Sequence, residues 1–415
     1  MPESEIQSQP PQETDEPSVS FQFLAATFLK VGLTAWGGFM ALVAIVQGIL
    51  VERRCLLTAE EMMDGISLGQ LLPGPMAVNV VSFAGYRLRG GLGALVSATM
   101  VLLPSFFLVI GLTWVWQQYG EIPQIKSAMA GFPPAIAAII ISAVITMGRK
   151  TLKGSPEKII AVLCAGLLLT VGGFYLTISV IAGAAVLGLA IWYRGSRPRQ
   201  QTPDSSEPYD RQRPAMLKWI AVSLLLMLFL IVFLFFQKHP LIVANPLLHL
   251  FTLFSGMSLM LFGGGFVFIP MIQGIVVQDL AWVTADEFTT ALAIGQITPG
   301  PILVSATVIG FLQQGFPGGF VATVGIFLPP SLLMIMASQA LESIKGSPAV
   351  QSALRGVRAA ITGLILAAAV TVIQTAEPHW ATALIFAASL TALLRYQLDV
   401  IWIIPSAGLL GLALL

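Results

Sequence analysis

The chain has 415 residues, of which 56% are hydrophobic and only 10% are charged, and its formal net charge is +1. Soluble domains carry about 25% charged residues, so this composition, with a mean hydropathy of +0.86, indicates a polytopic membrane protein. The small net charge excludes a global field that would attract nucleic acid. Cys55 and Cys164 stand alone, which gives no support to a disulfide framework or a zinc site.

The first segment, residues 1–20, is polar and acidic, and it contains no Lys or Arg. A secretory signal begins with basic residues, so we do not interpret this segment as one. Low hydrophobicity and excess charge are typical of disorder. The sequence therefore predicts a disordered polar tail over residues 1–20.

Thirteen apolar segments follow the tail, several of them near the ~20 residues that span a bilayer. In the first half they cover 21–50, 64–86, 92–116, 132–148, 159–172 and 174–193. In the second half they cover 250–278, 288–312, 318–340, 357–374, 380–394 and 398–415. Between the halves lie a basic linker, 194–218, and one single connecting helix, 219–236. Very long segments such as 21–50 also fit broken hairpins. We expect an N-terminal repeat over 21–193 and a C-terminal repeat over 250–415.

One sequence motif occurs twice. Gly69–Pro75 reads GQLLPGP, and Gly295–Pro301 reads GQITPGP, 226 positions later. The same offset relates Gly37-Gly38 to Gly263-Gly264, Gln47-Gly48 to Gln273-Gly274, and Pro104 to Pro330. Ala128–Gly131 matches Ala353–Gly356 at an offset of 225, which we assign to a one-residue slip in a connecting loop. This pattern indicates one folding unit that has been duplicated.

The two Pro-Gly-Pro elements predict breaks in membrane helices. Proline removes an amide donor and glycine loosens the backbone. In lipid, an unsatisfied peptide group costs several kcal/mol, so irregular backbone survives only inside protein or beside a wet cavity. Transporters place their substrate sites at such discontinuous helices, where helix N-termini attract anions. The alternative is an ordinary proline kink.

Candidate substrate-binding residues gather around these elements. They are Gly37, Gly38, Gly69, Gln70, Pro73, Gly74, Pro75, Gly263, Gly264, Gly265, Gln296, Pro299, Gly300 and Pro301, with Lys30 and Arg87. The glutamines would either bind an oxyanion or cap the broken helix. The glycine pairs would either face the opposite Pro-Gly-Pro element or serve close helix packing. Lys30 would snorkel or contact the ligand, and Arg87 would set topology or line an anion vestibule.

Two short motifs predict how the Pro-Gly-Pro segments begin. Thr58-Ala-Glu-Glu61 and Thr284-Ala-Asp-Glu287 each fit a capping box. A proton-coupling role for Glu61 or Glu287 is the minority alternative. The histidines are scattered, and there is no HExxH or GxSxG motif. We therefore expect no metal site, no cofactor, no catalytic residue and no enzymatic activity.

Basic loops stay in the cytoplasm, which predicts the topology. The basic 194–218 linker, Arg149 with its neighbours, and the Arg87 loop all fall on one side when the spans are counted. The single helix 219–236 then inverts the second copy. The loop charges of the second copy are consistent with this inversion, since Gln313 lies in an uncharged loop whose counterpart in the first copy is the basic Arg87 loop. Arg53 and Arg54 do not fit this topology, because counting the spans places them on the non-cytoplasmic side. Pairing with acidic neighbours, or a segment 21–50 that re-enters the membrane, would explain the exception.

These residues resemble the chromate ion transporter family in its long, two-domain form. The resemblance rests on Phe28–Gly38, on Val51–Arg54 followed by Leu57–Glu61, on Leu72–Pro75, and in the second half on Phe262–Gly265, Pro270 and Gly295–Pro301. It implies an all-α fold with two repeats. It also implies export of chromate, a tetrahedral dianion, through the plasma membrane, coupled to protons and giving chromate resistance.

We therefore expect a secondary oxyanion transporter whose partners are chromate, protons and the lipid bilayer, with the N-terminus and the 194–218 linker cytoplasmic. Transport of sulfate or a related oxyanion, and a passive anion channel, are the alternatives. A homodimer remains open.

Overall fold

The computed structural model describes residues 19–35, 38–170, 174–193, 240–261, 268–339, 348–375 and 379–415. Within these ranges the chain forms helices and no strands, so the prediction of an all-α protein is confirmed. The predicted tail (up to residue 18), the linker 194–218 and the single helix 219–236 lie outside the described residues. By length and apolar composition, three described stretches can cross a membrane: Met76–Tyr119, Pro123–Arg149 and Ile302–Gln339.

The first apolar segment folds back on itself. Helix α1 (Phe21–Thr34) is followed by α2 (Gly38–Gln47), which continues into the π-helix η1 (Gly48–Arg53). The Arg54 guanidinium lies 5.5 Å from the centroid of the Phe23 ring. A straight helix would hold these two residues about 45 Å apart. Segment 21–50 is therefore a helical hairpin whose tip lies after Thr34.

The Pro-Gly-Pro segment of the first half is a second hairpin. Helix α3 (Ala59–Leu71) ends before Pro73, and α4 (Met76–Tyr119) begins after Pro75. A Cβ on Gly65 would contact the Phe83 ring, and one on Gly69 would lie 3.1 Å from Val80. The two helices thus run antiparallel, with Pro-Gly-Pro at the tip. The sequence suggested one broken span over 64–86; instead, both ends of this segment lie on the same side of the tip.

The second half repeats both hairpins. The first consists of α11 (Pro246–Met260), α12 (Phe268–Gln273) and the π-helix η5 (Gly274–Asp279). The second consists of α13 (Ala285–Ile297), the 3₁₀-helix η6 (Ile302–Val304) and the start of α14 (Ser305–Gln339). At the base of these hairpins, the His249 and Trp282 rings lie 5.1 Å apart. A short helix, α10 (Pro240–Val243), precedes them.

Helices α4 and α14 each contain a sharp turn, at Arg89-Gly90 and at Gln314-Gly315. In α14, Thr307 and Thr323 have their Oγ1 atoms 2.7 Å apart, although a straight helix would separate these residues by about 24 Å. The turn positions differ by 225 residues, not 226, so the one-residue slip lies between Pro-Gly-Pro and the turn and not in the later connecting loop to which the sequence assigned it. Three residues of 3₁₀-helix in η6 rise about as far as four in an α-helix, which accommodates this difference. At this offset the counterpart of Pro104 is Pro329 and not Pro330.

The remaining helices form a bundle beside the hairpins. From the first half come α5 (Pro123–Ala130), α6 (Phe132–Thr151), α7 (Ser155–Thr170) and α8 (Phe174–Trp192). From the second half come α16 (Pro348–Thr375), α17 (Trp380–Arg395) and α18 (Val400–Leu414). Helix α16 packs against α6, α7 and α8, while α17 packs on α6 and α18 on α5. The two halves therefore share one bundle.

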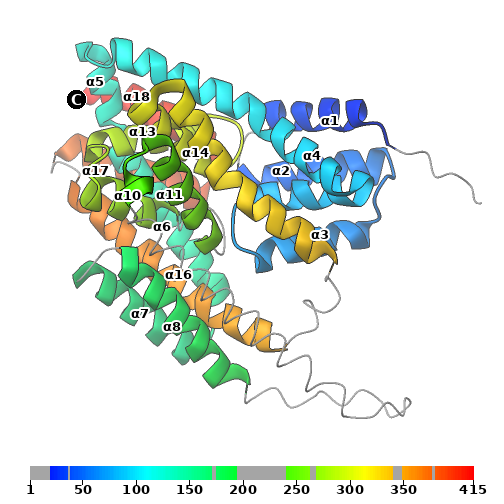
Figure 1. Cartoon of the computed structure of the whole chain (residues 1–415). Helices are drawn as coiled ribbons and strands as arrows, with labels where there is room; N and C mark the ends of the chain where they lie inside the picture. The colour runs from blue at the N-terminus through cyan, green and yellow to red at the C-terminus, as the bar shows by residue number, and fades with distance from the viewer. Residues whose placement is uncertain are drawn as a thin grey trace, which may run out of the picture.

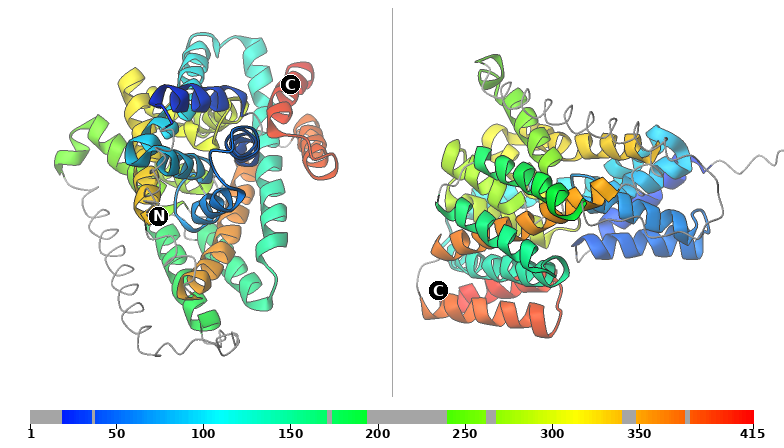
Figure 2. Two further views of the ribbon diagram at one scale, coloured as in Figure 1. Left: turned by 90° about the vertical axis from the view of Figure 1, so that its right-hand side faces the viewer. Right: turned by 90° about the horizontal axis from the view of Figure 1, so that it is seen from below.

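The hairpins of the two halves occupy opposite ends of the molecule. In Figure 1, α1, α2 and α3 lie at the right, and α10, α11 and α13 lie at the left. Figure 2 shows the same separation from below, with the blue hairpins projecting to one side. Helices α4 and α14 pack together between them. This arrangement brings the hairpin tips of the two halves to the middle of the molecule.

Candidate functional site

The tips of the hairpins exchange hydrogen bonds between the two halves. The Gly74 N–H donates to the carbonyl oxygen of Leu261 at 2.6 Å, and the Gly300 N–H donates to that of Ala35 at 3.3 Å. Both donors and both acceptors are related by the 226-residue offset. Such a mutual exchange is the mark of two units related by a two-fold axis. We call the region formed by residues 73–75, residues 299–301, Ala35 and Leu261 the tip junction.

The central glycine of each Pro-Gly-Pro element is required by its backbone and its neighbours. Gly74 has φ +107° and Gly300 has φ +112°, conformations that residues with a side chain rarely adopt. A Cβ on Gly74 would contact Pro330, and one on Gly300 would lie 2.7 Å from Ser105 Oγ. Each tip thus touches the second arm of the other half's long helix. The junction is closed in this structure.

Neutral polar side chains surround the junction. Asn79 is fully buried, and its Nδ2 donates to the Pro73 carbonyl oxygen at 3.1 Å, while its Oδ1 has no partner among the described residues. Ser105 donates to the carbonyl oxygen of Pro299. Ser82 donates to Ser331 across the two halves at 3.2 Å. The sequence reasoning missed all four side chains. For Asn79, the available signal was a polar residue one turn after Pro-Gly-Pro in an otherwise apolar helix.

Helix ends supply the electrostatics of this site. Helix α4 starts at Met76 and η6 starts at Ile302, so both begin directly at the tips. The N-terminal turn of a helix carries free amides and a partial positive charge. The buried charged or polar side chains in the described part of the chain include one carboxylate, Glu157, which lies in the bundle. The surroundings of the tips can therefore stabilise negative charge through amides and hydroxyl groups.

The predicted site residues do not all reach the junction. Pro73, Pro75, Pro299 and Pro301 are buried there, whereas Gln70 is exposed and Gln296 is half-buried. No described residue bonds to either glutamine side chain, so the capping alternative has no partner to support it.

Three other predicted residues do not belong to the tip junction. Gly69 and Gly295 pack inside their hairpins beside the tips, where a Cβ on Gly69 would lie 3.4 Å from the Met76 carbonyl oxygen and one on Gly295 would contact Ser305. Lys30 is exposed on α1. Ligand contact by Lys30 stays a prediction.

The glycine-rich motifs are only partly described. Gly37 and Gly263, Gly264 and Gly265 lie outside the described residues, and Gly38 opens α2. The residues just before them, Ala35 and Leu261, accept the amides of the opposite Pro-Gly-Pro elements. The motifs are therefore close in sequence to the junction.

Both predicted capping boxes are confirmed. Thr58 and Glu61 exchange bonds at the start of α3, as do Thr284 and Glu287 at the start of α13. Glu61 also accepts from Arg87, whose Nε lies 3.0 Å from its Oε1. This pair closes the base of the hairpin, so Arg87 is placed far from the tip. The Thr58 amide, and then Arg87, lower the pKa of Glu61 despite an opposing desolvation effect.

In the described part of the chain, no group of three His, Cys, Asp or Glu side chains is arranged to hold a metal ion. The polar groups around the tip junction are backbone groups, hydroxyl groups and the Asn79 side-chain amide.

Known proteins with similar sequences are transporters. The model of the chromate transporter family matches residues 23–189 and 248–412, one region in each half. The chain is 28% identical to a probable chromate transport protein of Synechococcus elongatus, over 85% of each chain. It is 26% identical to the chromate transport protein of Cupriavidus metallidurans, over 95% of this chain and 94% of that one.

It is also 29% identical to the chromate transport protein of Pseudomonas aeruginosa, over 95% of this chain and 92% of that one. No solved structure matches. The family match covers most of the chain in two regions, each of which includes the hairpins and most of the bundle helices of one half. The chain belongs to the chromate transporter family.

Proposed function

We propose that the protein is a secondary active transporter that exports chromate across the plasma membrane, driven by the proton gradient, and that the anion binds at the tip junction. The observation that carries the site is the reciprocal pair of bonds, Gly74 to Leu261 and Gly300 to Ala35. Each bond joins the Pro-Gly-Pro tip of one half to the backbone that follows the first helix of the other half, at a point where a helix begins beside irregular backbone. A tetrahedral dianion requires many N–H and O–H donors, which such a point provides.

The hairpins also support an inverted arrangement of the halves. If the first-half hairpins enter and leave on the same side, the N-terminus, Arg53, Arg54 and the Arg87 loop all lie in the cytoplasm. Arg53 and Arg54 are then no longer an exception to the topology predicted from the loop charges. Every basic loop of the first half obeys the positive-inside rule. The second-half hairpins, at the other end of the molecule (Figure 1), would enter from outside.

Transport then requires the tips to separate. Gly74 lies against Pro330 and Gly300 lies against Ser105, so in the described part of the chain each tip is packed on the long helix of the other half. An anion would enter from one side when one pair of tips moves, and leave when the other pair moves. Alternating access of this kind is the usual mechanism of transporters with inverted repeats.

Flux through purified protein in liposomes tests this function. Radiolabelled chromate should move with saturable kinetics and should respond to an imposed pH gradient that a protonophore abolishes. Pro75→Ala and Pro301→Ala should each abolish flux without loss of inserted protein. Flux that rises linearly with concentration and ignores the gradient would instead identify a passive channel. Stronger inhibition by sulfate than by unlabelled chromate would assign the site to sulfate.

A further inference from the structure

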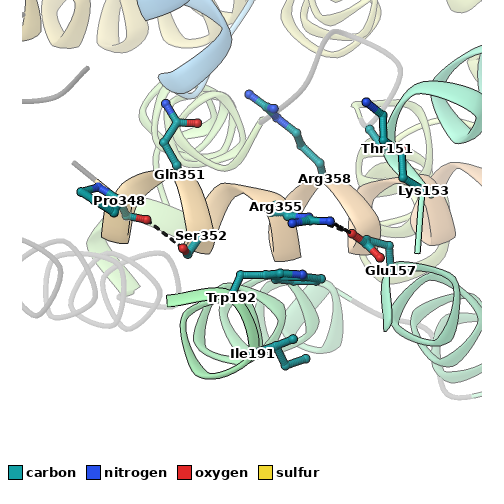
Figure 3. A pocket seen from close by; sticks show the side chains of 10 residues that line it. All are labelled: Thr151, Lys153, Glu157, Ile191, Trp192, Pro348, Gln351, Ser352, Arg355 and Arg358. Carbon is teal, nitrogen blue, oxygen red and sulfur yellow. Dashed lines mark hydrogen bonds and ion pairs between the residues drawn. The ribbon is translucent and has the colours of Figure 1, made fainter. Parts of the chain in front are cut away.

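Helix α16 packs closely against α7 and α8 of the other half. A Cβ on Gly356 would contact the carbonyl oxygen of Ala184 in α8, and a Cβ on Gly363 would contact that of Ala161 in α7. Small residues allow helices to approach in this way. A pocket of ≈ 750 Å³ lies beside this crossing and is lined by α16, by the end of α8 and by residues of α6 and α7 (Figure 3).

One acid and one arginine of the pocket neutralise each other. The Glu157 side chain is only 1% exposed, and its Oε1 accepts from Arg355 Nε at 2.7 Å and from Nη2 at 2.6 Å. The Arg355 guanidinium also lies 4.7 Å from the centroid of a Trp192 ring, in cation–π contact. A buried carboxylate requires such a partner. Glu157 is the one acid among the described residues of the lining, so this pair leaves no negative charge there.

A second arginine keeps its positive charge. Arg358 is half-buried on α16, and Figure 3 shows its side chain turned away from Glu157. None of the ion pairs among the described residues includes Arg358. The end of α6 lies against the same turn, because the Oγ1 atoms of Thr151 and Thr362 are 3.0 Å apart and Thr362 donates to the Arg358 carbonyl oxygen. The exposed Lys153 adds another cation to the lining.

We propose that this pocket binds a phosphate-type oxyanion group through Arg358 and Lys153, with the side-chain amide of Gln351 as a neutral donor. An arginine fork matches phosphate geometry. Basic pockets between membrane helices near the cytoplasmic face bind anionic lipid headgroups. Two sources carry this chemistry: the headgroup of an acidic phospholipid and a free tetrahedral oxyanion. The pocket shares no residue with the tip junction, so it stands apart from the proposed transport site.

Binding to the purified full chain in a neutral detergent tests the pocket. The probes are short-chain phosphatidylglycerol, short-chain phosphatidylcholine and inorganic phosphate. The wild-type protein should bind phosphatidylglycerol more tightly than phosphatidylcholine. Arg358→Gln should weaken that binding tenfold or more, since a hydrogen bond to a charged group contributes about 1.5–3 kcal/mol. The control Arg395→Gln changes an exposed arginine outside the pocket and should bind like wild type.

The phosphatidylglycerol and phosphate measurements distinguish a lipid headgroup from a free oxyanion. Binding of phosphatidylglycerol but not of phosphate, lost in Arg358→Gln, assigns the pocket to lipid headgroups. Binding of phosphate with a similar affinity, lost in the same variant, assigns it to a free oxyanion. If Arg358→Gln does not fold, Arg358→Lys keeps the charge but not the fork, and a several-fold weaker affinity supports the proposal. Unchanged affinity for both probes in a folded variant would overturn it.

Discussion

The hydroxyl groups of Ser82 and Ser331, which belong to different halves of the chain, lie 3.2 Å apart in the buried centre of the molecule. Ser82 follows the first Pro-Gly-Pro element on α4, and Ser331 lies on the second arm of α14, next to the Pro330 that contacts Gly74. A covalent bond between these two positions would hold the halves together beside the tips. The closed junction would then be fixed.

Cross-linking at these positions should stop transport. We expect Ser82→Cys/Ser331→Cys, in a background with Cys55→Ser and Cys164→Ala, to form a disulfide on oxidation and to lose chromate flux. A reducing agent should restore the flux. Each single cysteine variant is the control and should be insensitive to oxidant. Full flux through the cross-linked protein would show that the halves need not separate there.

Alanine at the central glycines should damage the junction. Gly74→Ala introduces a Cβ against Pro330 at φ +107°, and a strained backbone of this kind costs roughly 1–3 kcal/mol before the contact is counted. We expect flux to fall to background, and Gly300→Ala to do the same. Gly91→Ala, where a Cβ would meet nothing within 4 Å, is the matched control. Liposome flux at equal protein density measures all three, and normal flux in Gly74→Ala would contradict this account of the tips.

Asn79 should hold the first tip. Its Nδ2 donates to the Pro73 carbonyl oxygen at 3.1 Å in a fully buried site. Loss of a buried hydrogen bond costs about 1–3 kcal/mol. We therefore expect Asn79→Ala to lower kcat/KM for chromate by about tenfold, and Asn79→Asp to lower it further, because a carboxylate would repel both the carbonyl and the anion.

Ser97→Ala is the comparison for Asn79, because it removes a buried hydroxyl that has no partner among the described residues. It should keep normal kinetics. Equal losses in Ser97→Ala and Asn79→Ala would mean that general packing, and not the tip, is affected.

The base of the first α3–α4 hairpin should be sensitive to acid. The pKa of Glu61 is lowered, first by the Thr58 amide and also by Arg87, from an ordinary value of 4.5. A lowered pKa means that the contribution to stability is present above 4.5 and is lost as the pH falls through the folded-state value.

Glu61→Gln should therefore flatten the fall in Tm between pH 5 and pH 3 relative to wild type. The effect should be small, since a partly exposed pair contributes about 0.2–1 kcal/mol. Glu60→Gln, at the neighbouring exposed acid, should leave the slope unchanged. Parallel Tm curves for wild type and Glu61→Gln would show that the pair is not formed.

Local rules predicted the helices and the capping boxes, because each depends on residues near in sequence, and the repeated motif itself indicated the duplication. The capping box at Thr58 needs only Glu61, three residues on. The direction of the chain after Pro-Gly-Pro could not be predicted in the same way. A proline–glycine break permits either a bent span or a reversal, and the choice is made by contacts such as Gly65 against Phe83, eighteen residues apart.

The same limit explains the missed side chains. Ser105 and Ser331 lie far along the sequence from the tips, and only the packing of α4 on α14 brings them there. Gln70 is the opposite case, because it is close to the Pro-Gly-Pro segment in sequence but its side chain lies on the exposed face of the helix.

Two exposed positions test the inverted hairpins most directly. Cys55 and Ala281 are related by the 226-residue offset, both have positive φ (51° and 49°), and each lies between the two hairpins of its half. In sealed vesicles of known orientation, a membrane-impermeant maleimide should label Cys55 from the cytoplasmic side. In a Cys55→Ser background, Ala281→Cys should be labelled from the opposite side. Labelling of both positions from one side would contradict the inverted arrangement.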